Sequence, residues 1–148
     1  MSDDDKPVLV GMNHVALEVG DIDAALEFWN AIFDIKLRGR SDTMAFIDMG
    51  DQFIALAKTE TPHRDDHRHF GLIVDDRENV RARAEAAGAE ILPSGRLDML
   101  DPWGNFIQVI EYQDIQFSKT DAILRGMGLS HLEKTDAAKQ ELAKKGMV

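Results

Sequence analysis

The chain has 148 residues, which is enough for one domain with its own hydrophobic core. Its formal net charge of -10 argues against a general basic surface for nucleic acid or an anionic membrane. The chain contains no cysteine, so disulfides, thiolate metal ligands and a cysteine nucleophile are excluded. Neither a secretory signal nor a membrane-spanning run is recognisable, and we therefore expect a cytoplasmic protein.

In the first half of the chain, residues 1–6 are expected to be mobile, and residues 13–19 are predicted to form a strand. Apolar residues alternate along that strand, so His14 points to the opposite face. Asp21 or Asp23 can cap a helix whose apolar residues recur at helical spacing: Ile22, Ala25, Leu26, Trp29, Ile32 and Phe33. The pattern then predicts three short strands, at residues 35–38, 44–49 and 53–58.

The second half repeats this order after a polar stretch, residues 59–68. We interpret that stretch as a linker in which His63 and His67 are solvated. A strand follows at residues 69–74, then a helix at residues 78–87 that Gly88 can terminate. Strands are predicted at residues 91–92, 97–100 and 106–112, with a turn at residues 101–105 whose Trp103 is expected to pack on its own unit.

Strand parity places chemically useful side chains together. Apolar residues on one face of each strand face the helices, so the alternate positions face away from them. Four positions related by the repeat share that second face: His14, Ala55, His69 and Gln108. The sequence therefore predicts an α+β fold in which two imidazoles and an amide oxygen converge on one concave surface.

Three sequence stretches resemble the vicinal oxygen chelate superfamily, which includes glyoxalase I, extradiol dioxygenases and fosfomycin- and bleomycin-resistance proteins. They are Asn13-His14-Val15-Ala16-Leu17, His69-Phe70-Gly71-Leu72 and the more specific run from Asp101 to Glu111. The resemblance implies two βαβββ modules curled around a cleft, where a divalent metal takes two oxygens of the substrate. We expect one domain over residues 8–116, with repeats at 8–58 and 68–113. Residues 117–148 lie outside the resemblance and are expected to form a helical extension.

The same resemblance implies a metal site at His14, His69 and Gln108. The fourth-strand ligand of the glyoxalase branch falls on Ala55, which cannot bind a metal. The eighth-strand carboxylate of other branches falls on Gln108, whose neutral amide leaves the cation less well neutralised. We expect weakened binding of a divalent ion such as Fe, Mn, Ni or Zn. Glu18, Phe53, Phe106 and Ile110 are the candidate substrate-contacting residues, and no catalytic residue is assigned.

Three functions remain open at this point. The first is a metal-dependent lyase, isomerase, transferase or dioxygenase acting on a small oxygen-rich substrate. The second is a metal-free protein that binds a small molecule, as bleomycin-resistance relatives do, and the third is a structural or regulatory dimer with a vestigial cleft. The expected partners are a small molecule and a second copy of the chain. The extension is expected to pack in part through Ile123, Leu124, Leu129 and Leu132.

Overall fold

The computed structural model describes residues 6–7 and 12–147, so the expectation for the first five residues lies outside the described part. Two modules follow one another, each with the order strand, helix, strand, strand, strand. The first comprises β1 (His14–Val19), α1 (Ile22–Ile32), β2 (Leu37–Arg40), β3 (Met44–Asp48) and β4 (Phe53–Lys58). The second comprises β5 (Phe70–Val74), α2 (Arg77–Ala86), β6 (Glu90–Leu92), β7 (Leu97–Leu100) and β8 (Phe106–Glu111).

The first helix begins where the sequence places its cap, and the second helix is capped in the same way. The Asp21 carboxylate accepts a hydrogen bond from the backbone N–H of Ala24, and Asp76 does the same for Asn79. These bonds satisfy backbone donors that the first turn of a helix leaves free. Asp21, one of the two candidates for the first cap, is therefore the residue that fills this role.

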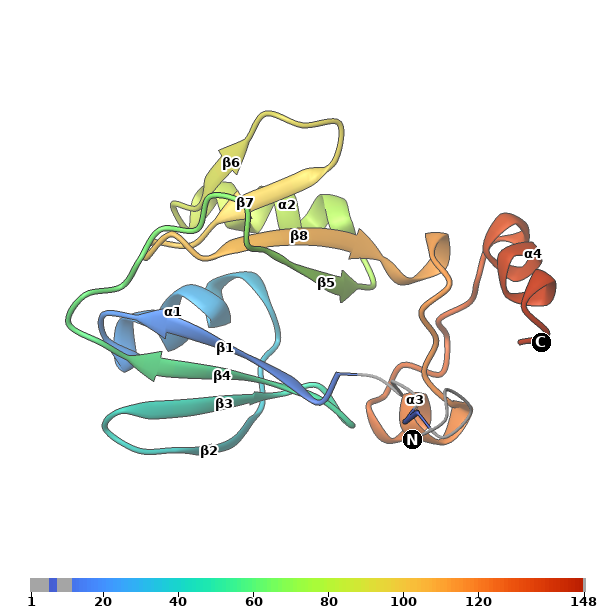
Figure 1. The fold of residues 1–148 in the computed structure, drawn as a ribbon, viewed down its shortest axis with the longest axis horizontal. Helices are drawn as coiled ribbons and strands as arrows, with labels where there is room; N and C mark the ends of the chain where they lie inside the picture. Colours follow the sequence, from blue (N-terminus) through green and yellow to red (C-terminus); the bar gives the residue numbers. More distant parts are fainter. Residues whose placement is uncertain (1–5, 8–11, 148) are drawn as a thin grey trace.

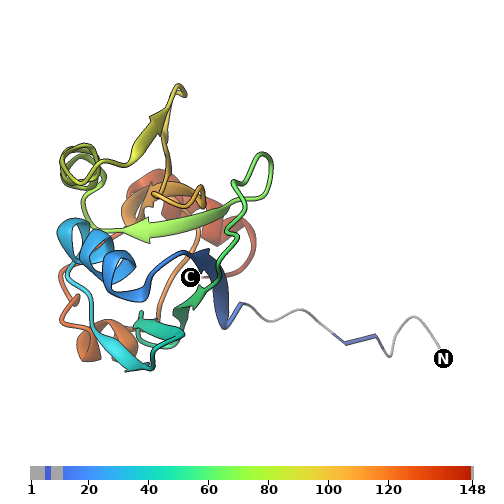
Figure 2. The same cartoon turned by 90° about the vertical axis from the view of Figure 1, so that its left-hand side faces the viewer.

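The strands form two separate four-stranded sheets, in the orders β1-β4-β3-β2 and β5-β8-β7-β6. In each sheet the first and last strands of the module pair in parallel, and the other pairs are antiparallel. Figure 1 shows the strands in succession from β6 to β2, and Figure 2 shows α1 and α2 together on one side of them. The α+β fold of paired βαβββ modules is confirmed.

One hydrophobic core joins the modules. It contains the helix-facing residues of both sheets, among them Leu17, Leu56, Leu72 and Val109, and the modules meet chiefly through α1 and α2. Trp29 is 1% exposed in this core, as its helical spacing predicts. The opposite faces of the two sheets, which we call the outer faces, are the ones on which strand parity places His14 and His69.

The second strand differs from the sequence expectation. It was predicted at residues 35–38, with a turn from residue 39, but β2 occupies Leu37–Arg40. Its register against β3 shifts between Leu37 and Gly39. This irregularity in the pairing allows the strand to continue past Gly39 instead of ending there. The remaining strands agree with the prediction to within one or two residues.

The C-terminal extension contains α3 (Asp121–Gly126) and α4 (Asp136–Lys144). It contacts the first module at the turn between β3 and β4, where Lys119 donates to the Asp51 carboxylate and the backbone carbonyl of Met49. Met127 lies against Gly50 in the same turn. No helix in the described residues has both the length and the apolar character needed to cross a membrane.

We expect Leu124→Ala to show whether the extension is part of the cooperative fold. Leu124 is 6% exposed, and truncating a buried leucine costs about 2–5 kcal/mol of unfolding free energy. The measurement is the urea midpoint compared with that of Ile123→Ala, whose side chain is only partly buried. An unchanged midpoint for Leu124→Ala would mean that residues 117–148 unfold separately from the rest.

Candidate functional site

The outer face of the first sheet holds His14 at the start of β1. Its imidazole stacks on Phe53 of the neighbouring strand, with ring centroids 4.6 Å apart and an interplanar angle of 7°. Ala16 pairs with Ala55 on the same face, and Ala55 offers no ligand. We call His14, Phe53 and Ala55 the first half-site.

The outer face of the second sheet carries the matching group. His69 precedes β5, and its ring lies 5.2 Å from that of Phe106 on β8. Gln108 pairs with Gly71 and Ile110 with Ile73, so both β8 side chains share this face. We call His69, Phe106, Gln108 and Ile110 the second half-site. Each candidate residue except Glu18 thus falls in one of the two half-sites.

Both histidines are held in the same way. His69 Nδ1 lies 2.8 Å from the backbone carbonyl oxygen of His67, and His14 Nδ1 lies 2.9 Å from the side-chain oxygen of Asn13. A carbonyl oxygen only accepts hydrogen bonds, so in both contacts Nδ1 is placed to donate. An Nδ1 held by an oxygen is the buttressing pattern found in histidines that ligate a metal through Nε2.

Within one chain the structure leaves the half-sites apart. A hollow of about 240 Å³ between the modules is lined by His69 but not by His14. Among residues 6–7 and 12–147, no group of three His, Asp or Glu side chains could hold a metal ion. Since the helix-covered faces of both sheets share one core, the two outer faces lie outside it.

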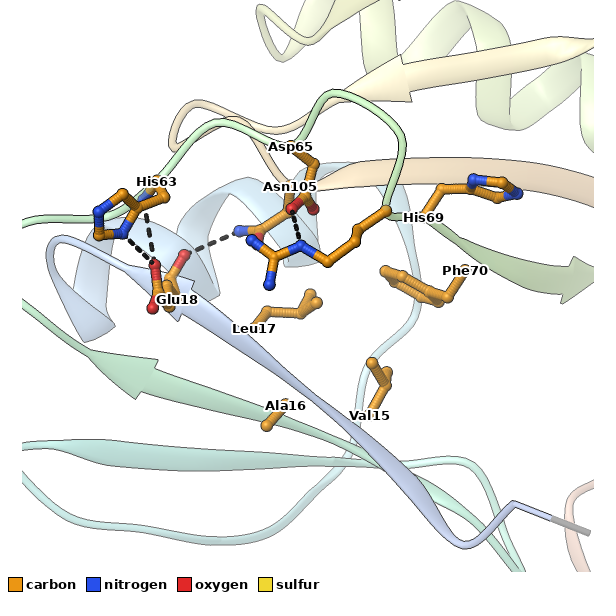
Figure 3. A pocket seen from close by; sticks show the side chains of 10 residues that line it. Val15, Ala16, Leu17, Glu18, His63, Asp65, His69, Phe70 and Asn105 are labelled. Carbon is orange, nitrogen blue, oxygen red and sulfur yellow. Dashed lines mark hydrogen bonds and ion pairs between the residues drawn. The ribbon is translucent and has the colours of Figure 1, made fainter.

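The hollow separates β1 from β5, and Figure 3 shows its side chains. Val15 and Leu17 lie opposite Phe70 in it, while the His69 ring turns away from Glu18. Glu18 accepts hydrogen bonds from the backbone N–H of His63 at 3.0 Å and from its ring at 3.3 Å. The bond from the backbone N–H is the main cause of a lowered Glu18 pKa, so this carboxylate stays ionised.

The stretch between the modules was predicted to be a solvated linker. It has no helix or strand, but it is anchored at several points. Arg64 donates two hydrogen bonds to Glu90, at 2.8 and 3.0 Å, and the Asp65 carboxylate accepts one from the backbone N–H of Phe106. His67 and His63 are both exposed as expected, although His63 also lines the hollow.

The turn before β8 links the modules through Asn105. Its side-chain amide donates to the backbone carbonyl of Glu18 at 2.8 Å and to the buried carboxylate of Asp101 at 2.7 Å. Burial raises the Asp101 pKa, and the hydrogen bonds from Asn105 partly offset that rise. Trp103 lies against Gly20, so the expectation that it packs on its own module misses this contact with the first one.

The two βαβββ modules, each with its own four-stranded sheet, place the chain in the class of paired-module α+β folds. A sequence profile of the Glyoxalase/Bleomycin resistance protein/Dioxygenase superfamily matches residues 11–109, and the chain belongs to that superfamily. The resemblance to vicinal oxygen chelate proteins is thereby confirmed.

The matched proteins include several that are named for fosfomycin resistance. The chain is 27% identical over 114 residues to glutathione transferase FosA of Serratia marcescens, covering 69% of this chain and 81% of the relative. The fold is similar to the fosfomycin resistance protein FosX of Listeria monocytogenes, solved with Mn(II) and sulfate. That match has a TM-score of 0.62, 15% identity and coverage of 81% of this chain and 99% of FosX.

A glyoxalase-family protein from Bacillus anthracis is similar at a TM-score of 0.60 and 16% identity, over 72% of this chain and 98% of that one.

Proposed function

We propose that this protein is a metal-dependent enzyme that binds a divalent cation through His14, His69 and Gln108 and acts on a small oxygen-rich molecule. The observation that supports this most strongly is the shared state of the two imidazoles, each with Nδ1 held by an oxygen. Both side chains are exposed in the single chain, and the occurrence of the same pattern at repeat-related positions supports a shared role for the two rings.

The donor set fits a divalent ion of intermediate hardness. Two imidazole nitrogens and one amide oxygen suit Mn, Fe, Ni or Zn, with water or substrate oxygens completing the shell. Gly71, which pairs with Gln108, also leaves space beside it. A Cβ at position 71 would lie only 3.2 Å from the tip of Ile110, so any larger residue would fill that space. When bound, the metal supplies Lewis-acid polarisation of the substrate oxygens.

The chain's own residues position the substrate. Phe53, Phe106 and Ile110 are half-buried on the outer faces and offer apolar contact with its carbon skeleton. Glu18, kept ionised by His63, can accept a hydrogen bond from a substrate hydroxyl. The Serratia relative is named a glutathione transferase, which favours group transfer among the reactions left open by the sequence.

The proposal further requires two copies of the chain. The first half-site of one copy faces the second half-site of the other, which brings one His14 and one His69 to the same ion. The half-buried aromatic rings on both outer faces support this, because pairing them buries apolar surface that one chain leaves open. A homodimer with two shared sites follows.

Titration of chelator-free protein with Mn(II), Ni(II) and Zn(II) by calorimetry tests the proposal. We expect one ion per chain, and a loss of at least about 100-fold in affinity in His14→Ala and in His69→Ala because each removes a ligand. His131→Ala, at an exposed histidine of the extension, is the control and should bind normally. Gln108→Glu should tighten binding, since it adds a negative charge.

Absence of metal binding by the wild-type protein would overturn the proposal. The half-buried rings beside His14 and His69 would then favour the second function, in which the outer faces bind a small, partly aromatic molecule without metal. Equilibrium dialysis with small aromatic ligands, which should lose binding in Phe53→Ala, would identify that case.

A further inference from the structure

The turn between β3 and β4 lies next to the first half-site. It leads directly into Phe53, the first residue of β4, on which the His14 ring is stacked. It also holds the chain that enters β1. The Gln52 side-chain amide donates to the Met12 carbonyl at 3.0 Å. The Phe53 N–H donates to the Asn13 carbonyl at 3.1 Å. Both groups that contact His14, the Phe53 ring and the Asn13 side chain, therefore depend on the position of this turn.

The C-terminal extension contacts the turn through a nearly buried lysine. Lys119 Nζ donates to the Met49 carbonyl at 2.9 Å and to the Asp51 carboxylate, and its side chain is only 10% exposed. This hydrogen bond is the main cause of a lowered Asp51 pKa, so the carboxylate is ionised and the contact is an ion pair. Met127 packs closely on Gly50, where an added Cβ would lie 2.6 Å from the sulfur. Figure 1 shows α3 at the end of the first sheet where β1 and β4 begin.

The equivalent turn of the second module, between β7 and β8, is stabilised from within. The buried Asp101 carboxylate accepts hydrogen bonds from the backbone N–H groups of Trp103 and Asn105, both at 2.9 Å. It accepts a third from the Asn105 side chain at 2.7 Å. In the first module the carboxylate of the turn, Asp51, is half-exposed and is held by Lys119 instead. The extension therefore gives the first module a restraint that the second module makes with its own residues.

We infer that Lys119 is a positioning residue for His14. By holding the turn between β3 and β4, it fixes the Phe53 ring and the Asn13 side chain, which orient the imidazole. The inference rests on the proposed function for its link to metal, but the orientation of His14 is a property of the metal-free chain. Sequence reasoning did not single out Lys119, because its partners Met49 and Asp51 lie 70 and 68 residues earlier in the chain.

NMR of the metal-free protein tests the orientation directly. At alkaline pH, where the ring is neutral, the ¹⁵N signals of His14 should show a proton held on Nδ1; their loss in His14→Ala assigns them. In Lys119→Met, which has no donor, they should move toward the averaged values of an imidazole that exchanges between tautomers. The His69 signals should stay in place, because that ring is held by the His67 carbonyl. Unchanged His14 signals, or equal movement of both rings, would show the inference to be wrong.

A second variant identifies the contact that acts on the ring. Asp51→Ala should move the His14 signals in the same direction as Lys119→Met but less far, because the Met49 carbonyl remains as an acceptor. The double variant should match Lys119→Met alone, since both substitutions remove one ion pair. Lys139→Met, at an exposed lysine of α4, is the control and should leave the signals unchanged. A double variant that moves them further would contradict the inference, because Asp51 would then act independently of Lys119.

Metal affinity connects this positioning role to the site. Lys119→Met should weaken Mn(II) binding about 10-fold, as loss of a ligand's outer support typically does. Lys139→Met should bind as the wild type. Wild-type affinity in Lys119→Met would mean that the extension has no role in metal binding. If the wild-type protein binds no metal, the proposed function fails, whereas the His14 signals still decide whether Lys119 positions the ring.

Discussion

A heterodimer made of one His14→Ala chain and one His69→Ala chain should bind one metal ion, although neither variant binds any as a homodimer. In such a pair one shared site lacks both imidazoles, but the other combines the intact His14 of one chain with the intact His69 of its partner. Two different affinity tags on coexpressed chains allow this heterodimer to be purified. Calorimetry or elemental analysis then gives the stoichiometry.

The expected values separate the arrangements sharply. Sites shared between copies give two ions in the wild-type dimer, one in the heterodimer and none in either variant homodimer. Sites contained within one chain give none in the heterodimer, because each chain then lacks one ligand of its own site. A heterodimer that also binds no ion would therefore show that the half-sites of separate copies do not combine.

The packing of the two modules is the reason to expect sites shared between copies. The helix-facing sides of both sheets merge in one core, and the hollow between β1 and β5 reaches His69 but not His14. The sequence predicts which residues share a face, because alternation within a strand is a local property. It does not predict how the two modules pack, since that depends on contacts between α1 and α2 far apart in the chain.

The candidate site illustrates the same limit. His14 and His69 were identifiable because they begin equivalent strands of the repeat. The oxygen that holds His14 belongs to the preceding residue, Asn13, and was within reach of sequence reasoning. The one that holds His69 is the backbone carbonyl of His67, and its position depends on the conformation of the stretch between the modules.

That stretch was predicted to be a solvated linker because its residues are polar and mixed in charge. Its anchors come from distant positions: Glu90 binds Arg64, and the backbone of Phe106 binds Asp65. Polar composition indicates exposure correctly at residues such as His67, but it cannot reveal which charged side chains will be paired. The fixed conformation of this segment therefore depends on partners that are remote in the sequence.

Gly104→Ala should be among the most destabilising single substitutions in this protein. Gly104 has a φ of +87°, and a Cβ added there would lie 2.6 Å from the Cα of Arg64. The left-handed backbone costs an alanine about 1–2 kcal/mol. The contact with backbone atoms adds to that cost, because it cannot be relieved by rotating a side chain. We expect a total loss of about 3–4 kcal/mol in unfolding free energy.

Gly128→Ala provides a matched control for this prediction. Gly128 has a φ of +74°, but nothing lies within 4 Å of a Cβ added there. It should therefore show the backbone cost alone, about 1–2 kcal/mol. The excess loss in Gly104→Ala measures how firmly the stretch from His63 to Asp65 is held against the turn before β8, where the Asp65 N–H donates to the Gly104 carbonyl at 2.8 Å. Equal losses in the two variants would mean that the stretch from His63 to Asp65 moves away from the added Cβ at no cost in unfolding free energy. The side of the hollow that this stretch forms would then not be rigid.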